Sequence, residues 1–152
     1  MQYYNPSPFG TFLSLFFRRP KRLQIAALCH RYRGNAKEFL LITSRDTGRW
    51  IIPKGWPIRG LSSRETALRE AWEEAGVKNS KASDHSIGAF CYDKRRDNGL
   101  SVPVETLVYS VSVKEIADDF PEVDERVRKW VSAEDAADMV QEPELKAILR
   151  DQ

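Results

Sequence analysis

The strongest constraint on the fold is a stretch rich in proline and glycine, residues 53–61, that runs directly into a sharply bounded helix. Proline lacks an amide donor and glycine adopts unusual dihedral angles, so this stretch is predicted to be a loop. Ser62 followed by Glu65 matches a capping box, and Gly76 supplies a stop signal. The sequence therefore predicts a helix over Ser63–Ala75 immediately after a stiff loop.

Short apolar runs on both sides of this unit predict strands, and two capped segments near the end predict closing helices. The order of strands, loop, helix, strands and helices, without internal repeats, predicts an α+β sandwich. The expected strands are residues 23–28, 39–43, 50–52, 86–92 and 105–113, and the expected closing helices are residues 132–140 and 143–150.

The composition fits one domain that lacks disulfides. A chain of 152 residues with 41% hydrophobic residues can bury a single core. Cys29 and Cys91 show no spacing typical of a disulfide framework or a zinc site, which favours a reducing, cytoplasmic location. We expect residues 20–152 to form the domain and residues 1–19 to be an N-terminal extension packed on it.

The apolar segment at residues 9–17 is too short to span a bilayer, and its basic residues follow it instead of preceding it. Neither a signal peptide nor a membrane span is expected, although a peripheral membrane contact is an alternative for this segment.

Charge is distributed unevenly, although the formal net charge is only +2. Basic residues gather at positions 18–33 and 94–96, whereas acidic residues outnumber basic ones over 115–144. Basic clusters beside an acidic, metal-binding site would suit a polyanionic substrate. Solvated surface charge is the alternative interpretation.

Three glutamates crowd one side of the predicted helix. Glu70, Glu73 and Glu74 have the spacing i, i+3 and i+4, so their carboxylates are expected to repel one another. No lysine follows four residues later, and Arg69 can pair well only with Glu73. A bound divalent cation would relieve the repulsion, and Mg²⁺ prefers such hard oxygen ligands. An ordinary acidic solvent face is the alternative.

A helical wheel, on which successive residues stand about 100° apart, shows which residues lie on the other side of the predicted helix. Leu68, Ala71, Trp72 and Ala75 form the opposite, apolar face, which predicts that Trp72 belongs to the core. In the preceding loop, Lys54 is expected to hold a phosphate beside the metal. Trp56 is expected either to stack on a base or to pack against the loop.

Residues 55–77 resemble the Nudix box: a glycine, five residues, a glutamate, seven residues, then Arg-Glu-aliphatic-x-Glu-Glu-x-Gly-aliphatic. Two positions depart from it, because Leu61 stands where the first glutamate belongs and Ala71 is smaller than the usual aliphatic residue. By this long motif the chain is identified as a member of the Nudix family, which implies an α/β/α sandwich with a mixed sheet. The matching residues are Gly55, Arg69, Glu70, Glu73, Glu74, Gly76 and Val77.

From about residue 20 onward the chain is similar to the diphosphoinositol polyphosphate phosphohydrolase branch of that family. The similarity rests on residues 20–22, 40–45, 49–53, 94–96 and 125–130. Three departures are Lys54 and Trp56, which replace small residues, and Glu142, which precedes a proline where the branch has a basic residue. The basic residues that the resemblance places on substrate phosphates are Lys21, Arg22, Arg45, Arg95, Arg96 and Arg126, beside Lys54 and Gly55 of the loop.

The resemblance implies a pyrophosphohydrolase that acts on acid anhydrides in phosphorus-containing compounds. Glu70 and Glu74 would bind Mg²⁺, with Mn²⁺ as the alternative ion. Glu73 would be a further ligand or help to activate the attacking water, and Arg69 would orient Glu73. The expected substrate is a small polyphosphate: a dinucleoside polyphosphate, a diphosphoinositol polyphosphate or a nucleoside diphosphate derivative.

Two other functions compete with this prediction. A Nudix-fold module that binds a nucleotide or an RNA end without cutting it would explain the departure at Leu61, but it has no need for three crowded glutamates. A basic protein that binds nucleic acid or a membrane surface is disfavoured by the near-zero net charge. We therefore expect no stable nucleic-acid partner and no membrane span, and the sequence leaves the oligomeric state open.

Overall fold

The sheet is mixed because its two central strands run parallel while the other strand pairs are antiparallel. The computed structural model describes residues 22–152, and in it β1 (Arg22–Arg33) lies beside β7 (Ser101–Ile116) with Ile25 opposite Leu107. Parallel neighbours need a long connection, and this connection carries the predicted loop and helix. The expected N-terminal extension, residues 1–19, and the candidate Lys21 lie outside the described residues.

Six further strands complete the eight-stranded sheet, whose longest path has the order β3-β2-β1-β7-β5. On the other pairings, β4 lies on β1, β6 on β7 and β8 on β2. Their bounds are β2 (Ala36–Thr43), β3 (Trp50–Ile51), β4 (Lys54–Gly55), β5 (Val77–Ala82), β6 (Gly88–Arg95) and β8 (Arg128–Val131), with a short 3-10 turn, η1 (Val123–Glu125), before β8.

Helix α2 (Ser63–Ala75) has the predicted bounds, and both predicted caps are present. The Ser62 hydroxyl accepts a hydrogen bond from the amide of Glu65, and the Glu65 carboxylate accepts one from the amide of Ser62 at 2.7 Å. Gly76 ends the helix in the left-handed region with φ 69°, where a side chain would also meet Phe120. Loop and helix are therefore fixed locally by the sequence.

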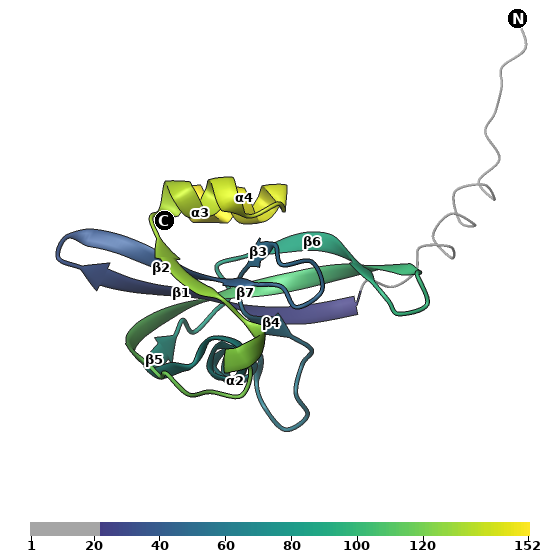
Figure 1. Ribbon diagram of the computed structural model, residues 1–152, viewed down its shortest axis with the longest axis horizontal. Coiled ribbons are helices and arrows are strands. Elements are labelled where there is room, and N and C mark those ends of the chain that lie inside the picture. Colours follow the sequence, from purple (N-terminus) through teal and green to yellow (C-terminus); the bar gives the residue numbers. More distant parts are fainter. Residues whose placement is uncertain (1–21) are drawn as a thin grey trace, which may run out of the picture.

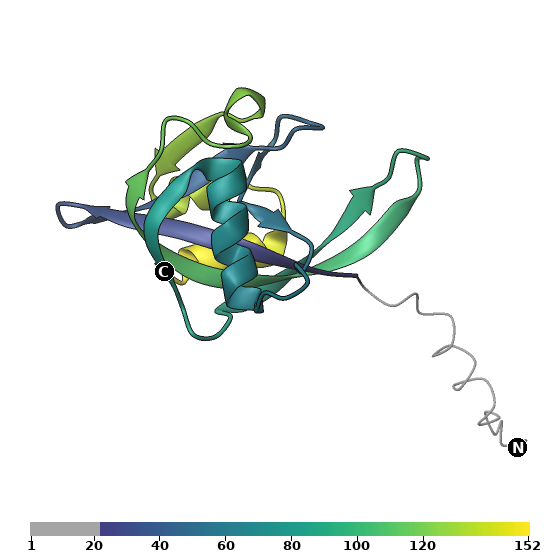
Figure 2. The same ribbon diagram turned by 90° about the horizontal axis from the view of Figure 1, so that it is seen from below.

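Helices cover both faces of the sheet, as Figure 1 shows, with α2 on one face and α3 (Ala133–Met139) and α4 (Pro143–Arg150) on the other. β1 divides the two cores by its alternation: Ile25 and Ala27 pack toward α2, and Ala26 and Leu28 toward α3 and α4. Figure 2 shows α2 lying across the central strands. The expected α/β/α sandwich with a mixed sheet is confirmed.

Several details of the predicted elements were wrong. Lys54–Gly55, expected inside the loop, pairs with β1 as β4, since two extended residues suffice for a short edge pairing. β5 and β8 were not predicted because their sequences, VKNSKA and RKWV, are mostly polar and become strands only by pairing with β7 and β2.

Trp72 is half-buried and contributes to neither core, so its predicted core position was also wrong. The Lys78 ammonium lies 5.6 Å from its ring centroid. The helix instead buries Ala67, Ala71 and Ala75 against the sheet, because small side chains allow a close approach.

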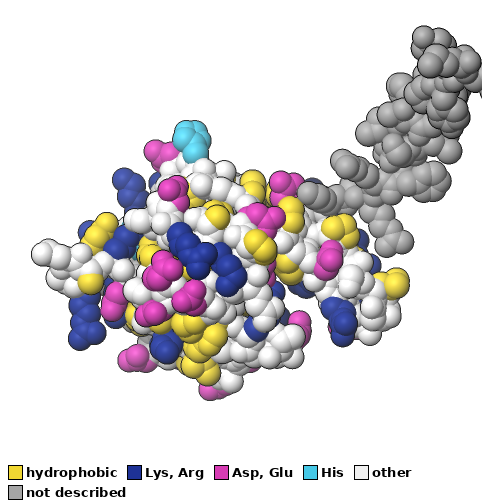
Figure 3. All heavy atoms as spheres, turned by 90° about the horizontal axis from the view of Figure 1, so that it is seen from above, with side chains coloured by type: hydrophobic (Ala, Val, Ile, Leu, Met, Phe, Trp, Pro, Cys, Tyr) yellow, Lys and Arg dark blue, Asp and Glu magenta, His cyan; other side chains and the backbone are white. Residues whose placement is uncertain are grey.

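Acidic and basic side chains are interspersed on the face that carries α3 and α4, as Figure 3 shows. One such group joins Arg150 to Glu134 and Asp138. Cys29 and Cys91 form no disulfide, as predicted. In residues 22–152, no helix combines the length and apolar character that crossing a membrane requires.

Candidate active site

One cavity of about 480 Å³ brings together loop, sheet and helix residues that are far apart in the sequence. We call it the main cavity. Its lining is dominated by basic side chains, with Glu74 of α2 as the contribution of the predicted glutamate cluster. Seven basic side chains face four carboxylates, Asp46, Glu74, Asp93 and Asp97, and this excess of positive charge suits a polyanionic ligand. The basic lining residues are Arg45, Arg49, Lys54, Lys94, Arg95, Arg96 and Arg126.

Glu74 is buried at the inner side of α2 and is held from two directions. Its Oε2 accepts a hydrogen bond from the backbone amide of Lys54 at 3.1 Å, and its Oε1 lies 2.7 Å from Nη2 of Arg126. Burial raises the pKa of Glu74, while Arg126 acts in the opposite direction. The helical wheel placed Glu74 on the outer face, which was wrong because these two partners compensate its burial.

Glu70 packs directly against the backbone of Gly55. A Cβ atom at position 55 would overlap the Glu70 carboxylate, so the glycine of the motif leaves the space that this carboxylate occupies. Desolvation raises the pKa of Glu70 to about 7, and the neighbouring charges of Glu74, Glu73 and Glu122 add to the effect. The predicted mutual repulsion of the glutamates is therefore present in the structure.

Glu122 joins the cluster from the segment before η1, and sequence reasoning missed it. Its backbone amide donates to the carbonyl of Glu73 at 3.1 Å, and its carboxylate contacts Arg126 at 2.9 Å and Arg45 at 3.2 Å. The only sequence signal was its position four residues before Arg126. Contacts this distant in sequence appear only once β8 has brought the segment back to α2.

Arg69 and Glu73 form the expected i, i+4 pair, with 3.8 Å between Nη1 and Oε1. Both side chains are substantially exposed, 54% and 40%, so the pair stabilises the fold little. That Arg69 orients Glu73 stays a prediction, which this contact is consistent with.

The chemistry of the donors fits a hard divalent cation, although the ligands are not converged. In residues 22–152, no three acidic, histidine or cysteine side chains already form a group that could hold a metal ion. The cluster nonetheless offers carboxylate oxygens, and the pKa of Glu70 is raised first by burial and then by repulsion from the neighbouring carboxylates, which a cation between them would relieve.

Lys54 of β4 is half-buried and lines the main cavity. Its ammonium lies 5.4 Å from the centroid of the Tyr92 ring. Burial lowers the pKa of Lys54 from 10.5 to about 8, although Glu74 and Glu142 favour its charged form. Beneath it, Arg49 and the buried Glu142 form an ion pair of 2.6 Å. The acidic residue before Pro143 therefore serves as a partner for Arg49.

The depressed pKa of Lys54 predicts a pH-dependent stability in metal-free protein. Between pH 8 and 10.5 the unfolded chain binds the Lys54 proton more tightly than the folded chain, so the free energy of unfolding should rise with pH. Lys54→Met removes this term. From pH 7 to 10.5, we expect the free energy of unfolding of the wild type to rise by up to about 3 kcal/mol relative to that of Lys54→Met. Urea unfolding in EDTA measures the difference, and a constant difference would contradict the prediction.

Of the other predicted residues, Arg45, Arg95 and Arg96 line the main cavity, whereas Arg22 lies in a neighbouring cavity described below. Arg126 is only 4% exposed, and its guanidinium binds Glu74, Glu122 and the carbonyl of Thr43. In this structure it therefore organises carboxylates.

Leu61 replaces the first glutamate of the motif, and no neighbour takes that place. Glu65, the nearest acidic residue, is fully engaged in the cap of α2 through the Ser62 amide. Its pKa is lowered, first by this hydrogen bond. Glu65 therefore does not replace the missing motif glutamate.

Comparison with known proteins identifies the family of this chain. Residues 22–152 match the family model described as the NUDIX domain, so the chain belongs to the Nudix family. It is a pyrophosphohydrolase of that family, as the motif predicted. Nudix hydrolases generally use divalent metal ions.

Among curated relatives, Nudix hydrolase 21, chloroplastic, of Arabidopsis thaliana is 30% identical, over 95% of this chain and 77% of that protein. The human diphosphoinositol polyphosphate phosphohydrolase 3-beta is 32% identical, over 76% of this chain and 67% of that protein. The branch suggested by the sequence is thus represented among the relatives.

Solved structures share the fold at low sequence identity. The Ap4A hydrolase of C. elegans superposes with a TM-score of 0.65 at 20% identity, covering 86% of this chain and 95% of the other. The Nudix domain of Shewanella oneidensis NrtR, complexed with ADP ribose, superposes with a TM-score of 0.64 at 18% identity, covering 93% of this chain and 96% of the other. At these identities the likeness establishes the architecture alone.

Proposed function

We propose that this protein hydrolyses a phosphoanhydride bond in a small polyphosphorylated substrate, with a divalent cation held by Glu70, Glu73 and Glu74. The observation that carries the proposal is a cluster of mutually repelling carboxylates at the edge of a cavity lined by basic side chains. Mg²⁺ is the expected ion, with Mn²⁺ as the alternative. Bound there, it would lower the pKa of a water molecule and neutralise charge on the phosphoryl oxygens.

The basic side chains of the main cavity have the role of binding the substrate. Lys54, Arg45, Arg95 and Arg96 bind and orient the phosphate groups, since they line the cavity and carry the complementary charge. Arg22 would extend this surface at the start of β1, whereas the role of Lys21, outside the described residues, stays a prediction from the sequence.

The carboxylates have distinct surroundings. Arg126 and the Lys54 amide fix Glu74, and Gly55 leaves room for Glu70. Glu73, oriented by Arg69, remains the exposed member, placed to be a further ligand or to accept a proton from water. A cytoplasmic location stays a prediction, because one Arabidopsis relative is named chloroplastic.

A non-catalytic module that binds a nucleotide or an RNA end is the second candidate function. Two observations favour it: Leu61 replaces a motif glutamate, and the carboxylates of the described residues are not converged as a ligand shell. A Nudix domain with similar architecture holds ADP ribose in its solved structure.

Hydrolysis assays separate the two functions. The purified protein is incubated with a dinucleoside tetraphosphate, a diphosphoinositol pentakisphosphate and ADP ribose, each in Mg²⁺, in Mn²⁺ and in EDTA. We expect cleavage of at least one substrate that EDTA abolishes and added Mg²⁺ restores. Binding without cleavage of any substrate in either metal would support the binding module instead.

A further inference from the structure

Positive charge in the main cavity lies at two depths, which we call the rim and the floor. The rim side chains Arg45, Arg95 and Arg96 are exposed. The floor side chains Arg49 and Arg126 are only 22% and 4% exposed. Water screens a charge at the rim strongly and a charge at the floor weakly. Each floor charge therefore has the larger effect on a bound polyanion.

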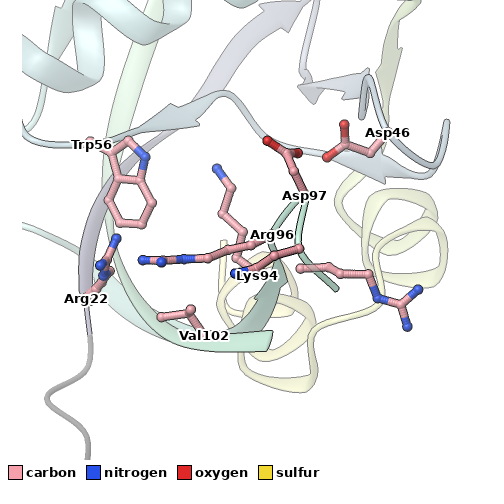
Figure 4. Close-up of a pocket in the computed structure, with 9 residues that line it drawn as sticks. Arg22, Asp46, Trp56, Lys94, Arg96, Asp97 and Val102 are labelled. Carbon is pink, nitrogen blue, oxygen red and sulfur yellow. The ribbon is translucent and has the colours of Figure 1, made fainter. Parts of the chain in front are cut away.

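The rim continues into a second cavity of about 460 Å³ at the start of β1, which we call the outer cavity. Residues 94–97 and Asp46 line both cavities, so the two adjoin. Arg22 and Trp56 also line the outer cavity, and the Lys94 ammonium lies 5.1 Å from the centroid of the indole ring. Figure 4 shows Asp46 on the side of this cavity away from Trp56. Basic side chains thus extend across both openings, and the rim offers a broad surface to any ligand that carries phosphates.

Both floor arginines are held by carboxylates. Arg126 contacts Glu74 and Glu122. Arg49 contacts Glu142, with 2.6 Å between Nη1 and Oε1. A paired guanidinium attracts phosphate less than an unpaired one, because the carboxylate cancels much of its field. The floor therefore presents less positive charge than its two arginines alone would supply.

Glu142 is the carboxylate of these pairs that neither the glutamate cluster nor helix capping explains. Its side chain is 7% exposed and makes no hydrogen bond that caps α4, although it stands directly before Pro143 at the start of that helix. The Oε2 atom is buried without a hydrogen-bond partner among the described residues, which is a costly arrangement for a carboxylate.

The charge of Glu142 acts on groups that line the main cavity. It opposes the burial that lowers the pKa of Lys54. Burial raises the pKa of Tyr92 to about 12, and Glu142 adds to this effect. Lys54, Tyr92 and Arg49 all line the main cavity. A single buried carboxylate thus influences the floor through three side chains.

We propose that Glu142 sets the charge selectivity of the main cavity. By pairing with Arg49 from behind the cavity wall, it lowers the positive charge of the floor, so a densely phosphorylated ligand gains less affinity than a free guanidinium would supply. Ligands with a short chain of phosphates lose less by this pairing. Glu142 acts through Arg49 and Lys54 and is therefore a positioning residue. The inference rests on the proposed function in taking the main cavity as the site that binds phosphates.

The test measures binding without turnover, by titration calorimetry in EDTA. Its probes are inorganic tripolyphosphate, a short chain, and inositol hexakisphosphate, a densely charged ring. Charge selectivity is the Kd of tripolyphosphate divided by the Kd of hexakisphosphate. Glu142→Gln keeps the shape of the side chain and removes its charge. It should tighten hexakisphosphate binding about tenfold and tripolyphosphate binding about twofold, which raises the selectivity about fivefold.

Salt and a matched variant separate the effect of charge from a structural effect. The gain in selectivity should shrink when NaCl is raised from about 0.05 M to about 0.5 M, because salt screens charges and leaves packing unchanged. Glu144→Gln is the same substitution two residues further along α4, at an exposed side chain. Its selectivity should stay within about twofold of the wild type. Circular dichroism checks that each variant is folded.

A second pair of variants keeps the test decisive where Glu142→Gln, which leaves Arg49 unpaired, fails to fold. Arg49→Met should lower the selectivity, because it removes a floor cation and keeps Glu142. The double variant Arg49→Met/Glu142→Gln removes both charges, a change that buried pairs often tolerate. Its selectivity should return to within about twofold of the wild type.

Each outcome decides the proposal. It is overturned if folded Glu142→Gln protein keeps the wild-type selectivity, if both probes tighten equally, or if the double variant binds the probes as Arg49→Met does. Failure of the wild type to bind either probe also overturns it, because the main cavity would then not bind phosphates. Hydrolysis is scored separately. The expected shift in selectivity in a protein that cleaves nothing would refute the hydrolase function and leave the role of Glu142 standing, and hydrolysis with an unchanged selectivity would do the reverse.

Discussion

Replacing Glu74 by glutamine should lower kcat by about a hundredfold or more while the protein stays folded. Glutamine preserves the shape and still offers a carbonyl oxygen to Arg126 or to the Lys54 amide, so the packing of α2 should persist. It removes the negative charge that lines the main cavity, and loss of metal-ion stabilisation of a phosphoryl transition state is worth several kcal/mol. Steady-state kinetics in saturating Mg²⁺ measure the change, and circular dichroism checks the fold.

The matched control is Glu65→Gln, the same substitution in the same helix. Glu65 is exposed, and its role is to accept the Ser62 amide, which a glutamine carbonyl can also do. Its activity should stay within about twofold of the wild type. Normal turnover by the Glu74→Gln protein would refute the assignment of Glu74 to the metal site.

Replacing Arg126 by methionine should destabilise the metal-free protein by about 3–5 kcal/mol. The substitution leaves Glu74 and Glu122 without their shared guanidinium and the Thr43 carbonyl without a donor. Removing one partner of a buried ion pair costs this much because the remaining charge stays desolvated. Urea denaturation in EDTA measures the loss, which corresponds to a fall in Tm of several degrees or more.

Arg150→Met provides the comparison for this second prediction. Arg150 also contacts two carboxylates, Glu134 and Asp138, but it is 47% exposed. Exposed pairs contribute little, so we expect a loss below about 1 kcal/mol. Equal stability losses in the two variants would show that Arg126 is not the organising charge of the carboxylate cluster.

The part of the fold that the sequence predicted well is the part determined by local interactions. The bounds of α2 follow from Ser62, Glu65 and Gly76, all within one turn of the helix ends, and the structure reproduces them. β5 and β8 are different, because their polar sequences acquire strand structure from partners that are remote along the chain. Periodicity within a single segment carries no information about such partners.

In the candidate site, too, the local features could be predicted from the sequence and the long-range features could not. The crowding of Glu70 with Glu73 and Glu74 was visible in the i, i+3 and i+4 spacing, and these charges add to the burial that raises the pKa of Glu70. The inward position of Glu74 was not visible, because it depends on Arg126, which is 52 residues away. Long-range compensation of this kind reverses the outcome of a helical wheel, since the wheel treats every carboxylate as a group that seeks solvent.

The parallel pairing of β1 with β7 also determines when the sheet can be completed during synthesis. β1 is made first, yet its partner on that side begins only at Ser101. Until the ribosome has released that segment, the β7-facing edge of β1 has no native neighbour, and an open strand edge invites association with other chains. Glu122 and Arg126 emerge later still. Catalytic competence is therefore expected to arise abruptly, after most of the chain has been made, and nascent chains stalled before that point should be the ones that depend on chaperones.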